Sequence, residues 1–145
     1  MNLVERFQKI VKRNENRIIE IHSKQLGQGK DSDNKTITPP YSDSYKKVKK
    51  KKGLGSYGKA INRVTLFLTG EYHSSYKITL SNNKIEFGPD STNADLGQVL
   101  VNRYGEEIEG LTEKNEEITI IQVLPELQRG AKKDLSILFN AVFDI

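Results

Sequence analysis

Residues 66–88 read LFLTGEYHSSYKITLSNNKIEFG, and this stretch decides the fold that the sequence predicts. Apolar and polar residues alternate over residues 76–80 and again over 85–87, as they do in half-buried strands. The tetrapeptide SNNK at 81–84 separates the two runs, and asparagine tolerates the positive φ angles of a turn. The sequence therefore predicts an antiparallel hairpin at about residues 76–87. The side chains expected to face the core are Ile78, Leu80, Ile85 and Phe87.

Helices are predicted on both sides of this hairpin. Residues 2–26 carry apolar residues at helical spacing and end at Gly27, so they are expected to form one N-terminal amphipathic helix in which the patch at Asn14 can introduce a bend. A short helix is expected from Asp95 to Tyr104, and C-terminal helices are expected from Thr112 onward, with Pro125 causing a kink or a restart. The predicted fold class is α+β.

Only short elements are predicted for the segment just before the hairpin. Residues 64–68 are expected to form a short strand or an extended segment, and residues 71–75 a single helical turn.

The chain finishes with the apolar sequence LFNAVFDI, which is expected either to fold over the sheet or to dock into a neighbour.

Length and composition indicate one small domain over residues 1–145, because 145 residues suit one core and only 35% of them are hydrophobic. The chain has no cysteine, which excludes disulfides, thiolate metal sites and a cysteine nucleophile. No apolar run approaches the roughly 18 residues of a membrane span. The N-terminal residues are charged throughout, unlike a signal peptide. We therefore expect synthesis in the cytoplasm and no membrane partner.

Charge is divided unevenly along the chain. Residues 1–70 contain 16 Lys/Arg and 6 Asp/Glu, whereas residues 71–145 contain 7 Lys/Arg and 13 Asp/Glu. Such a chain can bind a copy of itself head to tail, can contact nucleic acid with its basic half, or can neutralise itself within a monomer.

Residues 27–63 are predicted to form a long polar and basic loop region. Asp31–Asn34 resembles a calcium loop only in its alternating acidic residues; the sixth-position Gly and twelfth-position Glu are missing, so we expect a turn. The lysine run is expected to stay extended and solvated because its charges repel. With a neighbouring tyrosine it can bind a nucleic-acid backbone or an acidic protein surface, or remain a solvated loop. The residues concerned are Lys46, Lys47, Lys49, Lys50, Lys51, Lys52 and Tyr57.

No constellation of catalytic residues is evident. His73 precedes two serines, but adjacent residues seldom reach Ser–His geometry, and a single histidine on a polar turn is expected to be a surface residue. Four glutamates before and at the start of the C-terminal helices predict a solvated acidic face that could contact another subunit: Glu106, Glu107, Glu109 and Glu113. We therefore expect a protein that is not an enzyme, with no catalytic residues, cofactor or metal.

Three phrases of the chain resemble a protein family. They are QLGQGKDSDNKTITPPYSDSYKK at 25–47, VTLFLTGEYHSSYKITL at 64–80 and IEFGPDSTNADLGQVLVNRYGEEIEGLTEKNEEI at 85–118. Together they resemble small structural proteins of tailed bacteriophages, especially crAss-like and other phages of Bacteroidetes hosts, and more distantly tail-completion and virion-morphogenesis proteins. The resemblance covers roughly residues 25–118. Relatives often carry Phe where this chain has Glu109.

The resemblance implies a role in virion assembly. Such proteins form rings at the head–tail connector (neck), stacked on the portal, or cap the tail tube, and they have no catalytic residues. It implies a homo-oligomeric ring in the virion, with portal and other neck or tail proteins as partners and packaged DNA passing through the channel. The alternative from the residues alone is a small nucleic-acid-binding accessory protein that acts through Lys46–Lys52.

Overall fold

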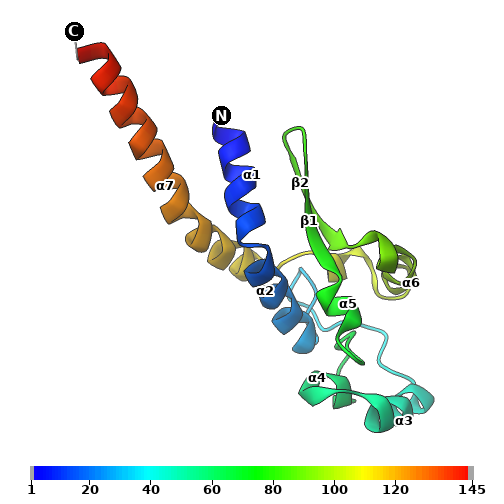
Figure 1. Ribbon diagram of the computed structural model, residues 1–145. Helices are drawn as coiled ribbons and strands as arrows, with labels where there is room; N and C mark the ends of the chain where they lie inside the picture. The colour runs from blue at the N-terminus through cyan, green and yellow to red at the C-terminus, as the bar shows by residue number, and fades with distance from the viewer. Residues whose placement is uncertain (1, 144–145) are drawn as a thin grey trace.

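The computed structural model describes the backbone of residues 2–143 and the side chains of residues 2–133. It is a mostly helical α+β structure in which one antiparallel hairpin lies between N-terminal and C-terminal helices, so the predicted fold class is confirmed (Figure 1). In chain order the elements are α1 (Leu3–Arg13), α2 (Glu15–Gly27), α3 (Asp43–Lys52), α4 (Gly55–Lys59), α5 (Glu71–Ser74), β1 (Tyr76–Ser81), β2 (Lys84–Pro89), η1 (Ser91–Asn93), α6 (Ala94–Tyr104), η2 (Glu106–Glu109) and α7 (Glu113–Phe143).

The hairpin forms where the alternation predicts it. Ile78 lies opposite Phe87, and Leu80 lies opposite Ile85. Asn83 occupies the turn with a φ of 56°, a left-handed conformation that asparagine tolerates. The helical turn α5 and the helix α6 also form at the predicted places.

The hairpin joins two hydrophobic clusters that the described side chains form. Tyr76 at the start of β1 belongs to the first cluster, and Ile78 two residues later belongs to the second. Phe87 of β2 packs against both. The first cluster consists of Leu26, Ile37, Tyr41, Val64, Leu66, Tyr72, Tyr76 and Ile108. The second consists of Ile10, Val11, Ile18, Ile78 and Val123, so it holds α1, α2 and α7 against the hairpin.

The N-terminal segment is two helices, where the sequence predicts one. Asn2 caps α1 as its side-chain oxygen accepts from the backbone N–H of Glu5 at 2.9 Å. The break falls at Asn14, whose side-chain amide donates to the carbonyl of Ile10 at 2.8 Å. This asparagine ends α1 because its side chain competes for a carbonyl of the last turn.

Residues 27–63 are not the long loop that the sequence predicts, because α3 and α4 lie within them. The segment that follows, 64–68, forms no strand and does not join the hairpin, and Leu66 in its middle has a φ of 53°, in the left-handed region, so the predicted strand or extended segment is not observed. Its backbone is satisfied by Tyr41, whose hydroxyl accepts from the N–H groups of Thr65 at 3.0 Å and Leu66 at 2.9 Å. A buried side chain therefore replaces a neighbouring strand.

The start of α7 is fixed by α2. Thr112 caps the helix, accepting from the N–H of Asn115 at 3.2 Å. Gln25 of α2 accepts from the Thr112 N–H and from the Asn115 side-chain amide, each at 2.9 Å, and donates to the carbonyl of Gly110 at 2.9 Å. Because Gln25 is buried and uses both ends of its amide, it holds the entry to α7 in one geometry.

From this anchor α7 runs alongside α1 and continues away from the rest of the chain (Figure 1). It passes through Pro125 as one helix, so the predicted restart does not occur. The prediction that LFNAVFDI folds over the sheet or docks into a neighbour concerns residues 138–145, which lie outside the described side chains. Among the described residues, no helix has the length and hydrophobicity needed to span a membrane.

Candidate functional site

The lysine run forms the helix α3 instead of an extended loop. Ser42 caps it, since its hydroxyl accepts from the backbone N–H of Tyr45 at 3.3 Å, and Asp43 lies in the first turn. The last turn carries Lys49 to Lys52, at the helix end where positive charge is favourable. The prediction of an extended loop was wrong because it counted only the repulsion between lysines and omitted this dipole and the tertiary contacts of one of them.

That one is Lys49, which is fully buried. Its ammonium donates to the carbonyl of Phe67 at 2.7 Å, to the hydroxyl of Thr65 at 3.0 Å and to the carbonyl of Tyr57 at 3.2 Å. It also lies 4.8 Å from the centre of the Tyr41 ring. Burial, and to a smaller extent the charge of Arg63, lowers the pKa of Lys49 to about 8. Lys49 therefore holds α3 on the domain and is not available to a partner.

The remaining lysines of the run lie on the outside of α3. Lys46, Lys47, Lys50 and Lys51 are at positions i, i+1, i+4 and i+5, which share one side of a helix. We call these four the lysine face; Lys52, three residues after the buried Lys49, lies on another side of the helix. All are exposed except Lys46, which is half-buried and lies 3.9 Å from Asp43. The structure thus gathers the charge of the run onto one surface.

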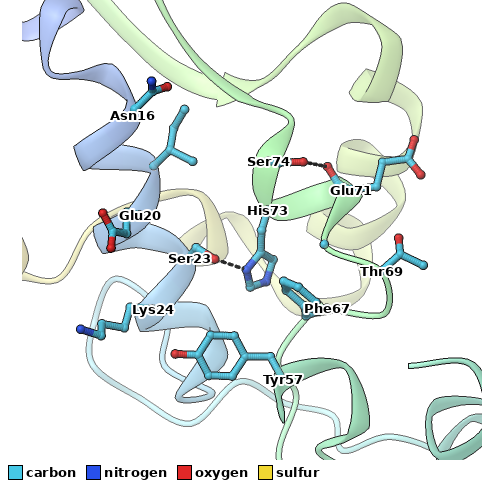
Figure 2. Close-up of a pocket in the computed structure, with 12 residues that line it drawn as sticks. Asn16, Glu20, Ser23, Lys24, Tyr57, Phe67, Thr69, Glu71, His73 and Ser74 are labelled. Atoms are coloured by element: carbon cyan, nitrogen blue, oxygen red, sulfur yellow. Dashed lines mark hydrogen bonds between the residues drawn. The ribbon is translucent and has the colours of Figure 1, made fainter. Parts of the chain in front are cut away.

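Tyr57, predicted to act with the lysines, points elsewhere. Its ring packs against Gly27, where an added Cβ would come within 2.4 Å of it, and edge-on against Phe67 at 5.9 Å between ring centres. Figure 2 shows this ring in a cleft beside His73. The backbone carbonyl of Tyr57 accepts a hydrogen bond from Lys49 of the lysine helix.

The predicted acidic face lies on η2 and the first residue of α7. Glu106, Glu107 and Glu113 are exposed, whereas Glu109 is half-buried. Burial, and then the charge of Glu106, raises the pKa of Glu109. Between them Ile108 is fully buried and anchors η2.

Two buried histidines link separate segments of the domain, and no local sequence pattern predicts either role. His22 is fully buried, and its Nε2 donates to the carbonyl of Ile108 at 2.8 Å, which ties α2 to η2. Its ring contacts Tyr76 and Phe87, at 4.5 and 5.2 Å between ring centres. Burial lowers the pKa of His22 to about 4.

His73 is also buried, so its expected surface position was wrong. Its Nε2 donates to the carbonyl of Thr65 at 2.7 Å, which leaves Nδ1 to accept from the Ser23 hydroxyl at 2.6 Å (Figure 2). Ser23 lies 50 residues away on α2, so adjacency along the chain could not reveal the pair.

The Ser23–His73 pair borders a cleft of about 720 Å³ between α2 and the segment around α5. A serine hydroxyl bonded to a neutral imidazole resembles a nucleophile with its base. However, burial lowers the pKa of His73 to about 4, which makes it a weak base at neutral pH. Ser23 also lies inside α2, where backbone N–H groups are used by the helix and cannot stabilise an oxyanion. The pair serves best as a link between α2 and α5.

Among the described residues there is no group of three or more His, Cys, Asp or Glu side chains that could hold a metal ion. The Asp31–Asn34 segment is a turn, as predicted, in which the Asp31 carboxylate accepts from the N–H groups of Asp33 at 3.0 Å and Lys35 at 2.9 Å.

No protein-family model matches the chain, and comparisons with curated proteins and with solved structures found no match either. Any assignment of function therefore rests on the surfaces that the described residues form.

Proposed function

We propose that the chain is a structural subunit of a bacteriophage virion that forms a ring at the head–tail connector, or neck, or caps the tail tube, without catalysis. The observation that carries the proposal is the presence of two oppositely charged surfaces on well-anchored elements. The lysine face lies on α3, which Lys49 attaches to the domain. The acidic face lies on η2, which His22 and Ile108 attach to it.

Two different complementary surfaces favour a head-to-tail contact between copies. In such a contact the lysine face of one copy meets the acidic face of the next, and the repeat closes into a ring when its rotation allows. An isolated exposed ion pair contributes little, but several like charges gathered on one rigid surface set the orientation of binding and its rate. Lysines left uncovered by this contact are suited to face packaged DNA in the channel.

Apolar surface is available for other neck or tail proteins. Leu96 and Val99 of α6 and Leu54 beside α4 are exposed. Between α3 and α6 lies a cleft of about 520 Å³, lined by Tyr45, Leu100 and other largely apolar residues. Exposed apolar groups beside an apolar cleft are typical of protein interaction sites, which supports partners such as the portal.

The ring is tested with purified protein by native mass spectrometry and electron microscopy. The variant Lys47→Glu/Lys51→Glu should lose the ring, and adding Glu106→Lys/Glu107→Lys to the same chain should restore it. The matched control is Lys9→Glu/Lys35→Glu, which changes the same net charge at exposed lysines outside α3. Rings that survive the reversal on α3, or absence of the protein from purified virions, would contradict the proposal.

The second candidate is a nucleic-acid-binding accessory protein, favoured by the density of exposed lysines on α3. It predicts DNA affinity that falls steeply as salt is raised, because lysine–phosphate contacts release counterions. Lys47→Ala/Lys50→Ala/Lys51→Ala should reduce that affinity and flatten its salt dependence. Unchanged affinity in this variant would reject the DNA-binding role and leave the ring proposal standing.

A further inference from the structure

The outward side of α7 changes character along its length. Its first turns expose the acidic residues Glu116 and Glu117, its middle exposes apolar side chains, and its last described turns expose basic residues. The apolar side chains are Ile120, Ile121 and Leu124, which are 53%, 66% and 41% exposed. The basic residues are Arg129, Lys132 and Lys133. We name these three zones the acidic end, the apolar centre and the basic end of α7.

The opposite side of α7 already has its partner. Val123 is buried in the second cluster, Leu127 packs against that cluster, and Glu126 lies 3.5 Å from Arg13 of α1. Figure 1 shows α7 running beside α1 on this side. The apolar centre therefore remains uncovered within the described part of the chain, although the transfer of isoleucine and leucine side chains out of water is favourable.

The order of the charged ends along α7 indicates which partner covers the apolar centre. We propose that α7 packs against α7 of a second copy in antiparallel orientation, with a two-fold axis at the level between Gln122 and Val123. This arrangement places the acidic end of each copy beside the basic end of the other copy. The two apolar centres are then in contact. An isologous contact of this kind closes on itself as a dimer.

Other pairings of the same helices bring like charges together. In a parallel pair the acidic ends of the two copies lie side by side, and so do the two basic ends. An antiparallel pair shifted toward the C-terminus brings the two basic ends together. Like charges held close are destabilising, so the charge pattern specifies both the orientation and the register.

The spacing of residues suits this geometry. Glu117, Ile121, Leu124 and Gln128 follow one another at intervals of four, three and four residues, the spacing of a coiled-coil seam. With the axis between Gln122 and Val123, Ile121 lies opposite Leu124 of the partner subunit, and Glu117 lies opposite Gln128 of the partner subunit. In that register Glu117 is also within reach of the basic end of the partner subunit.

The dimer rests on α7 alone and does not depend on the virion role, whose charged surfaces are the lysine face and residues 106–113. Sedimentation equilibrium of the full chain carrying Lys47→Glu/Lys51→Glu, in which the proposed ring contact is lost, should show a monomer–dimer equilibrium. In the same chain, Ile121→Asp/Leu124→Asp should weaken the dimer by at least about a hundredfold, because it buries charge in the apolar centre. The matched control is Leu96→Asp/Val99→Asp, which alters two exposed apolar residues of α6.

Both variants replace side chains that are at least 41% exposed, so circular dichroism should show that the helix content is retained. A Lys47→Glu/Lys51→Glu chain that stays monomeric over the micromolar range would overturn the proposal. So would a self-association that survives in Ile121→Asp/Leu124→Asp, or one that the α6 control abolishes equally.

Orientation is tested by cross-linking, which is simple because the chain has no cysteine of its own. Glu117→Cys mixed with Gln128→Cys should form a mixed disulfide dimer, and neither variant should cross-link to itself. In the antiparallel pair two copies of residue 117 are offset by about 16 Å along the helix, at 1.5 Å per residue. Self-cross-linking of Glu117→Cys would indicate a parallel pair and refute the proposed arrangement.

Charge reversal gives an independent check. Glu116→Lys/Glu117→Lys should weaken the dimer, because both ends of the helix become basic. Arg129→Glu/Lys132→Glu should weaken it for the opposite reason. Combining all four substitutions in one chain exchanges the ends and should restore association to within about threefold of the wild-type dissociation constant. Failure of the combined variant to recover would reject the pairing of acidic and basic ends.

Discussion

Acidification between pH 6.5 and 4 should unfold this protein through its two histidines. His22 and His73 are both buried and neutral, each with its pKa lowered from 6.5 to about 4 chiefly by burial. In the unfolded chain each ring takes up a proton near pH 6.5, whereas in the folded chain it does not until about pH 4. The unfolded state therefore binds more protons in this window, and stability falls as the pH falls.

The size of the effect follows from the shift. Between the two pKa values each histidine lowers the free energy of unfolding by about 1.4 kcal/mol per pH unit, which amounts to roughly 3 kcal/mol over the window. The two together approach the whole stability of a typical domain, about 5–15 kcal/mol. Above pH 6.5 both states carry neutral imidazoles, so the histidines contribute no pH dependence there.

Urea unfolding followed by circular dichroism from pH 7.5 to 4.5 measures this slope. His22→Gln and His73→Gln each remove one titrating ring and keep an amide that can donate to the same carbonyl. Each variant should show about half the wild-type slope, and the double variant should show almost none below pH 6.5. An equal slope in the double variant, or imidazole NMR signals that titrate near pH 6.5 in the folded protein, would refute this reasoning.

Three further predictions concern stability measured by urea unfolding at pH 7.5. Lys49→Met should cost about 2–3 kcal/mol because the Phe67 carbonyl loses its ammonium donor and the Tyr57 carbonyl and Thr65 hydroxyl each lose one hydrogen bond. Lys50→Met on the lysine face should change stability by less than about 0.5 kcal/mol, and equal effects would contradict the role of Lys49. Gln25→Ala should cost about 3 kcal/mol, since it removes the acceptor of Thr112 and the donor to Gly110, whereas Gln28→Ala on the exposed end of α2 serves as the control. Gly27→Ala should cost about 1–3 kcal/mol because its Cβ meets the Tyr57 ring, and the same substitution should cost much less in a Tyr57→Ala background; additive effects would argue against that contact.

The parts of the fold that the sequence predicts correctly depend on local signals. The hairpin follows from alternation over a few residues and from an asparagine turn, and the caps at Asn2 and Thr112 follow from side chains that reach three residues along the chain. The α6 helix and the α5 turn are local in the same way. Such signals do not require knowledge of what lies across the core.

The sequence-based predictions are wrong where contacts between residues far apart in the sequence determine the structure. Lys49 looks like every other lysine of the run, yet its acceptors lie 8 to 18 residues further on. His73 stands among polar residues, but its partner Ser23 is 50 residues away. The acidic face could be predicted as exposed glutamates, whereas the burial of Glu109 could not, because it depends on how η2 is anchored by His22, 86 residues before Ile108.

The hydrogen bonds of Gln25 have a consequence for synthesis on the ribosome. Its partners Thr112 and Asn115 are 87 and 90 residues further along the chain. The hydrogen-bond partner of the nearby His22 is the carbonyl of Ile108, which is also synthesised late. Until those residues emerge from the ribosome, the Gln25 amide and the His22 imidazole of the nascent α2 lack the partners that they have in the folded protein. Contacts of such long sequence separation slow folding because a large loop must close first. The hairpin can form early, but α1 and α2 reach their final place only when most of the chain has been made.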